Sequence, residues 1–327
     1  TVSVLYCITS PGMPLAKVQE EPKSEGGVSL FYDTFGDSTN PCVLLIMGLN
    51  AQMILWHDAF CEALASRGFF VVRFDNRDIG QSTKLEDAGV PSVCSLLCLP
   101  NCCAPKPAYT LEDMAADCIG LLDALKIGKA HIVGQSMGGM IAQLVAATYP
   151  DRTLTLTSVF SSPGMANPEP SLKIKLAMAE KPKDDSREAF IVCRREMARK
   201  CFIPEKHWDE AAVDELHGRM YDRSTYMDGG FRQAAALLRQ TSRMDRLKEI
   251  RCPTLVLHGK ADLVVPFPNA DATVKAIPTA KLVVLEDMGH SIMPAHYGPF
   301  CDAFVSNVGR LDSTAATEPI APTDASS

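Results

Sequence analysis

The sequence lacks the positive charge and the leader features that would point to nucleic acid or to a membrane. Its 39 acidic residues outnumber its 32 basic ones, and the net charge of −7 leaves no basic excess to attract nucleic acid or an anionic lipid surface. The opening residues 1–8 contain no basic segment and are too short to cross a bilayer, so we expect no stable membrane insertion. Since residue 1 is not methionine, processing of the N-terminus stays open.

The composition also lacks the marks of a small disulfide-bonded scaffold. Hydrophobic residues make up 46% and charged residues 22%, which is ordinary for a globular chain with a sizeable core. Most of the 12 cysteines are scattered through apolar patterns, as is typical of free thiols in a reducing compartment. We therefore expect a cytoplasmic protein, and nothing in the sequence indicates its oligomeric state.

One group of cysteines is clustered, namely Cys94, Cys98, Cys102 and Cys103 in a proline-containing loop. Their spacing lacks the paired Cys-x2-Cys units of structural zinc sites. We expect free thiols and no bound metal; a zinc site, a disulfide or acylated thiols are the alternatives.

Short apolar segments alternate with helical patterns along most of the chain. Strands are expected at residues 28–35, 42–47, 69–74, 130–133, 153–160, 254–258 and 281–285. Helices are expected at residues 58–67, after a cap at Thr110, after Ser136, near 268–277 and near 294–308. The strand–helix–strand order over residues 42–74 predicts a right-handed crossover, and therefore a parallel sheet in an α/β fold.

Residues 161–248 show only helical periodicity, with about four amphipathic helices. We expect them to form a helical cap, inserted into a core made of residues 28–160 and 249–309. The turn-rich residues 1–27 are expected to be an N-terminal extension. Residues 310–327 are poor in large apolar side chains, which predicts a disordered tail.

The most informative stretch surrounds Ser136, which lies between an apolar strand and a helical pattern. Gly134 and Gly138 flank it two positions away on either side, where a tight strand-to-helix turn leaves room only for small residues. Such a turn holds the serine oxygen clear of the backbone. We therefore predict that Ser136 is a nucleophile.

Two further reactive side chains follow other predicted strands. Asp262 comes after the strand ending at His258, and His290 after the strand ending at Leu285. Because ligands bind beyond the carboxyl ends of parallel strands, these groups are expected near Ser136. A serine needs an imidazole base, and the imidazole needs a carboxylate on its other nitrogen. Asp287 is the fallback for Asp262, although it shares the loop of His290.

The remaining parts of a hydrolytic site are backbone amides and an apolar pocket. The amides of Leu49 and Met137 are expected to bind an oxyanion, with Gly48 allowing the close approach. Apolar side chains near the predicted strand ends suit acyl or aromatic groups. The expected pocket residues are Met53, Ile54, Met165, Leu263, Val264, Ile292 and Met293.

These motifs resemble the α/β-hydrolase superfamily over roughly residues 28 to 309. Ser136, Asp262 and His290 follow the order of serine, aspartate and histidine found in that family. The run Asp75–Ser82 is similar to the Asp-x-Arg-Gly-x-Gly-x-Ser run of many members, with Asp78 where glycine is common. This variant resembles the branch that contains aclacinomycin methylesterases and related bacterial carboxylesterases and lipases. A second departure is Met47, where a histidine often precedes the oxyanion-hole glycine. The resemblance implies a mostly parallel sheet of about eight strands, an acyl-serine intermediate and no cofactor.

The prediction is therefore a lipase-like serine carboxylesterase that acts on a small apolar or acyl ester. Cleavage of a carbon–carbon bond or a thioester, and perhydrolysis, are the alternatives that use the same triad. A ligand-binding receptor on a hydrolase scaffold is the alternative from outside the enzyme class.

Overall fold

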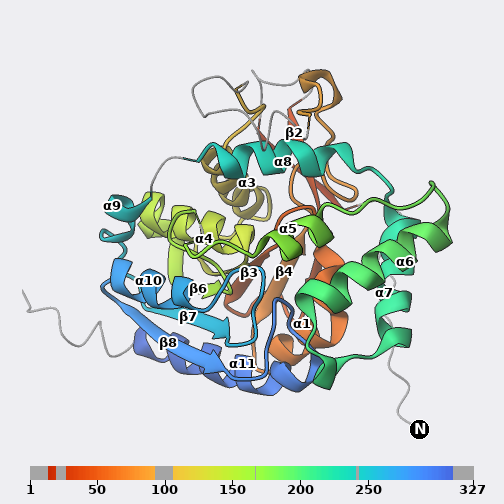
Figure 1. Ribbon diagram of the computed structural model, residues 1–327. Helices are drawn as coiled ribbons and strands as arrows, with labels where there is room; N and C mark the ends of the chain where they lie inside the picture. The colour runs from red at the N-terminus through yellow and green to blue at the C-terminus, as the bar shows by residue number, and fades with distance from the viewer. Residues whose placement is uncertain (1–13, 20–26, 93–105, 166, 241–242, 312–327) are drawn as a thin grey trace, which may run out of the picture.

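The computed structural model describes residues 14–19, 27–92, 106–165, 167–240 and 243–311 (Figure 1). The cysteine cluster and residues 312–327 of the predicted tail lie outside this described part. The seven cysteines within it, Cys42, Cys61, Cys118, Cys193, Cys201, Cys252 and Cys301, are all free. No helix of the described residues is long and apolar enough to span a membrane.

The core is one eight-stranded sheet in the order β1-β2-β4-β3-β5-β6-β7-β8. β1 pairs antiparallel with β2, and β2 with β4, whereas all other neighbours are parallel. The predicted α/β fold with a mostly parallel sheet is confirmed. In chain order the strands are Leu15–Gln19, Val28–Phe35, Cys42–Ile46, Phe70–Phe74, Ala130–Gln135, Thr153–Val159, Thr254–Gly259 and Ala280–Leu285.

Strand β1 lies within the segment that the sequence placed outside the fold. Only Ala16 of its five residues is buried, so its apolar pattern is weak among the surrounding prolines and charges. Its pairing with β2 instead makes it the edge strand of the sheet.

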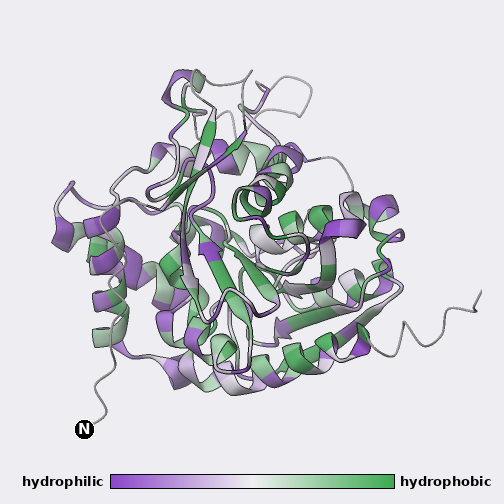
Figure 2. Ribbon diagram, turned by 180° about the vertical axis from the view of Figure 1, so that it is seen from behind, coloured by the Kyte–Doolittle hydropathy of each residue, from purple (hydrophilic) through white to green (hydrophobic). Residues whose placement is uncertain are grey.

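Helices cover both faces of the sheet. On one face α3 (Leu111–Ala124) and α4 (Met137–Thr148) share a core with β3, β4 and β5, and α10 (Pro268–Ala276) contributes Ala276 to the same core. On the other face α1 (Asp58–Ala65) and α11 (Pro294–Val308) supply Phe60, Leu64, Phe300 and Phe304. Because the central strands are covered on both sides, β3 and β5 are buried along their whole length, and Figure 2 shows hydrophobic residues concentrated in the strands.

The helix expected after Thr110 begins as predicted. The Thr110 hydroxyl accepts the Asp113 amide at 3.1 Å, and the Asp113 carboxylate accepts the Thr110 amide at 2.9 Å. This reciprocal capping box satisfies two amides that the first turn of a helix cannot pair internally.

Residues 161–248 are called here the helical segment. They contain α5 (Leu172–Met178), α6 (Arg187–Met197), a π-helical turn at Ala198–Phe202, α7 (Glu210–Arg223), α8 (Asp228–Leu238) and α9 (Met244–Leu247), and no strand among their described residues. Helices α6 and α7 pack side by side, while α8 runs across the top of the view in Figure 1. The segment lies between β6 and β7 in the chain, so it leaves the sheet at the carboxyl end of β6.

Candidate active site

Ser136 occupies a strained turn between β5 and α4. Its φ of 56° and ψ of −123° lie in a region that side chains rarely adopt. A Cβ atom at Gly134 would stand 2.0 Å from the Gly138 carbonyl oxygen, and one at Gly138 would stand 2.3 Å from the Ile46 carbonyl oxygen. Both positions therefore require glycine, because backbone atoms occupy the space of any side chain.

The start of α4 leaves amide donors beside Ser136. Gly139 and Met140 are the first amides to donate to the Ser136 carbonyl, at 2.9 and 3.3 Å, so the Met137 amide precedes the internal bonds of the helix. The turn after β3 approaches from the other side, since a Cβ atom at Gly48 would lie 3.2 Å from the Ser136 Cβ atom. Leu49, the second expected donor, follows Gly48 and lines the same cavity as Ser136.

His290 and Asp262 meet at the ends of β8 and β7. The His290 Nδ1 atom lies 2.8 Å from the Asp262 Oδ2 atom. The other oxygen of Asp262 accepts the amides of Val264 and Val265 at 2.8 and 2.9 Å, which fixes the carboxylate. This geometry leaves the His290 Nε2 atom as the one that can accept a proton.

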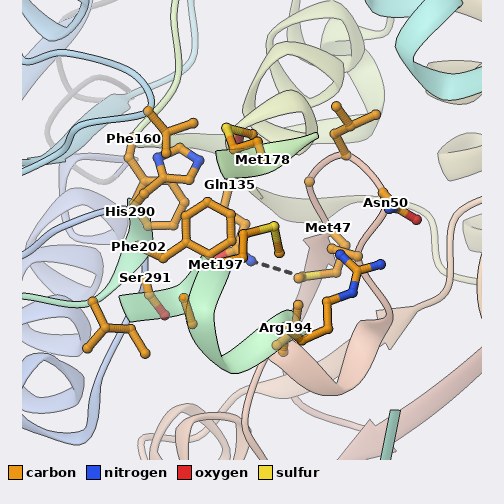
Figure 3. Close-up of a pocket in the computed structure, with 18 of the residues that line it drawn as sticks. Met47, Asn50, Gln135, Phe160, Met178, Arg194, Met197, Phe202, His290 and Ser291 are labelled. Atoms are coloured by element: carbon orange, nitrogen blue, oxygen red, sulfur yellow. Dashed lines mark hydrogen bonds between the residues drawn. The ribbon is translucent and has the colours of Figure 1, made fainter. Parts of the chain in front are cut away.

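The ring of His290 is held by two aromatic neighbours. Its centroid lies 4.6 Å from that of Phe160 and 5.8 Å from that of Phe202 (Figure 3). The backbone carbonyl of Phe202 also accepts the His290 amide at 2.9 Å. The helical segment therefore contacts the imidazole directly and can influence its orientation.

Asp287, the fallback carboxylate, points elsewhere. Its Oδ2 atom lies 2.5 Å from the Lys206 Nζ atom and 3.1 Å from the His207 Nε2 atom, and its Oδ1 atom lies 3.6 Å from the His296 Nε2 atom. The hydrogen bond from Lys206 lowers the pKa of Asp287 to about 2. The structure thus gives His290 the partner predicted first, Asp262.

Asp287, His207 and His296 are close enough together to hold a metal ion. However, the His296 Nδ1 atom accepts the Met293 amide at 3.1 Å, so the neutral ring carries its proton on Nε2, the atom that faces Asp287. Lys206 already balances the carboxylate. The arrangement fits an ion-pair cluster better than a set of metal ligands.

A cavity of about 1290 Å³ opens at Ser136 and His290. Four of the expected pocket residues line it: Ile54, Met165, Val264 and Met293. The other three do not. Met53 packs beside Phe190 and Met220, Ile292 is buried in the core under the sheet, and Leu263 is 52% exposed. All three flank cavity residues in sequence, but the local turns direct them away.

The comparisons with known proteins agree with the α/β fold described above. A family model described as alpha/beta hydrolase fold matches residues 41–297. The chain belongs to this family. It is 27% identical over 303 residues to rhodomycin D methylesterase DnrP of Streptomyces peucetius, covering 86% of this chain and 95% of that protein.

Two solved structures share the fold of this chain. The enol-lactonase of Burkholderia xenovorans aligns with a TM-score of 0.68 and 23% identity, covering 90% of this chain and all of that one. The meta-cleavage product hydrolase of Pseudomonas fluorescens aligns with a TM-score of 0.67 and 21% identity, covering 87% of this chain and 95% of that one. At this level of identity the likeness concerns the fold alone.

In this member of the family, the run Asp75–Ser82 joins the sheet to the helical segment. Asp78 has a φ of 70°, a left-handed conformation that favours glycine. Its carboxylate accepts two hydrogen bonds, each of 2.9 Å, from the guanidinium of Arg232 in α8. Gln233, the next residue, accepts the Asn50 amide at 2.9 Å and donates to the Arg77 carbonyl at 3.1 Å. Helix α8 therefore holds the turn that carries Leu49.

Sequence reasoning missed the polar groups that the helical segment brings to the cavity of this hydrolase-fold protein. Arg194 and His217 line it together with apolar residues of α6 and α7. Burial, with the neighbouring charge of Arg194, lowers the pKa of His217 to about 4. The available signal was the position of Arg194 in an apolar helical stripe between Phe190 and Met197, where a charge is unexpected.

Proposed function

We propose that the protein is a serine hydrolase that cleaves a carboxylic ester of an apolar or acyl substrate through an acyl-serine intermediate. The observation that carries this proposal is the convergence of Ser136, the paired His290 and Asp262, and two backbone turns on one cavity. The similarity to a methylesterase supports an ester as the bond that is broken.

In the proposed reaction the Ser136 hydroxyl attacks the ester carbonyl carbon while the His290 Nε2 atom accepts its proton. The resulting oxyanion takes hydrogen bonds from the Leu49 and Met137 amides. His290 then gives the proton to the leaving alcohol oxygen, which departs and leaves the acyl group on Ser136. A water molecule, deprotonated by His290, then attacks the acyl group and releases the acid from Ser136. Asp262 stabilises the imidazolium during both acylation and deacylation.

The helical segment serves as a cap in this proposal. It supplies Met178, Met197, Phe202 and Leu216 to a cavity larger than the roughly 300–1,000 Å³ of common small-molecule sites. Flexible thioethers adapt to ligands of different shapes. We therefore expect bulky acyl or polycyclic esters to fit better than acetate esters.

The test is labelling with a fluorophosphonate, which reacts with an activated serine. Wild-type protein is expected to gain one phosphonyl group per chain, and Ser136→Ala none. Ser306→Ala, which changes an exposed serine of α11, is the control and should label normally. A series of p-nitrophenyl esters of increasing acyl length then measures the acyl length that the pocket accommodates. Equal labelling of Ser136→Ala would refute Ser136 as the nucleophile. No turnover of any ester, together with tight ligand binding that survives Ser136→Ala, would favour the receptor alternative.

A further inference from the structure

Arg194 places a positive charge in an apolar part of the cavity. Its side chain is only partly exposed, and Figure 3 shows the guanidinium directed into the cavity, on the other side of this view from His290. Around it lie the Phe190 ring, 5.3 Å from the guanidinium carbon to the centroid, and the Met227 Sδ atom at 3.4 Å from Nη2. Neither neighbour carries a negative charge.

Three other cations of the helical segment each have a carboxylate partner. Arg195, the next residue, lies 2.7 Å from Asp214, Arg219 lies 3.0 Å from Asp58, and Lys206 lies 2.5 Å from Asp287. For Arg194 no carboxylate acts on the charge among the described residues, and burial alone lowers its pKa. Within the part of the chain that the structure describes, Arg194 is therefore a charge without a carboxylate partner.

An unpaired guanidinium in an apolar site is unfavourable, because desolvation is not offset by a partner. A bound anion would remove this cost, and a guanidinium matches a carboxylate with two parallel hydrogen bonds. His217 also lines the cavity and is neutral near pH 7, because burial and the charge of Arg194 lower its pKa to about 4. Arg194 therefore offers one positive charge without a carboxylate partner among the described residues, which suits a single carboxylate of a ligand.

We propose that Arg194 binds a carboxylate of the substrate, distant from the ester that Ser136 attacks. The inference rests on the proposed function and specifies its substrate class: esters whose acyl part carries a second, free acid group. The rest of the cavity wall, rich in methionine and leucine, then contacts the apolar chain or ring between the two ends.

The experiment compares p-nitrophenyl half-esters of dicarboxylic acids with five to ten carbons against p-nitrophenyl esters of monocarboxylic acids of equal length. Wild-type protein is expected to prefer the half-ester at one chain length by about 10-fold or more in kcat/KM, mostly through KM. Arg194→Met should abolish the preference while changing neutral esters less than about threefold. Arg194→Lys should restore part of it, because the charge returns without the planar fork.

Arg195→Met is the matched control, since it removes the neighbouring arginine that pairs with Asp214. It should keep the preference. Equal losses on neutral and charged esters in Arg194→Met would assign Arg194 a structural role and overturn the inference, as would a wild-type protein without any half-ester preference.

A binding measurement separates this inference from the proposed function. Calorimetry with the Ser136→Ala protein and monomethyl esters of the same diacids needs no turnover. Binding that is lost in Ser136→Ala/Arg194→Met supports the carboxylate site even if no ester is hydrolysed. Turnover of neutral esters without such binding would support the proposed hydrolase function and refute the carboxylate site at Arg194.

Discussion

The ion pair between Asp78 and Arg232 gives the sharpest prediction about stability. Asp78 is fully buried and Arg232 is 1% exposed, and two nitrogen–oxygen contacts of 2.9 Å join them. The perturbation is Asp78→Gly, which introduces the residue common at this position in the resembled superfamily. It removes the carboxylate and leaves the guanidinium of Arg232 buried without its charge partner.

The expected loss follows from two opposing effects. Breaking a buried ion pair by removing one partner costs about 3–5 kcal/mol. Glycine adopts the left-handed backbone at φ 70° without strain, which stabilises the variant by about 1 kcal/mol. We therefore expect Asp78→Gly to lower the free energy of unfolding by about 2–4 kcal/mol.

A double variant tests whether the unpaired charge is the cause. Asp78→Gly/Arg232→Met removes both charges and should recover most of the stability, because replacing a buried pair with apolar groups is often nearly neutral. Urea unfolding followed by tryptophan fluorescence measures each variant, with Trp56 in the core and Trp208 in the helical segment as reporters. A loss below about 1 kcal/mol for Asp78→Gly, or a double variant no more stable than the single one, would refute the reasoning.

Three further outcomes are expected. Gly138→Ala would place a methyl carbon 2.3 Å from a backbone oxygen, so we expect loss of fluorophosphonate labelling or of folded protein, whereas Gly128→Ala, with nothing within 4 Å, should behave as wild type. Gln233→Leu removes the acceptor of the Asn50 amide and should lower kcat at least about 10-fold by displacing the Leu49 turn, with circular dichroism unchanged; an unchanged kcat would contradict this. Burial lowers the pKa of His131 to about 4, below the roughly 6.5 of an unfolded chain. The unfolded state therefore binds the extra proton, and stability falls by up to about 3 kcal/mol as pH drops from about 6.5 to 4; His131→Gln should flatten this slope in urea titrations.

The sequence alone determined most of the fold and the order of Ser136, Asp262 and His290 along the chain. Continuous apolar segments predict buried parallel strands because both faces of the sheet are covered, and the glycines around Ser136 predict a turn that admits no side chain. Both signals are local, so neighbouring residues suffice to produce them. Strand β1 was not predicted from the sequence, because a half-exposed edge strand needs few apolar residues.

The tertiary structure decided the contents of the cavity. The structure paired His290 with Asp262 because two strand ends lie side by side, while it placed Asp287 against Lys206. Met53, Leu263 and Ile292 are next to cavity residues along the chain but point elsewhere, because a turn can reverse the direction of adjacent side chains. The sequence predicts only that Arg194 lies on an amphipathic helix. Only the folded structure shows that it lines a cavity and has no carboxylate partner among the described residues.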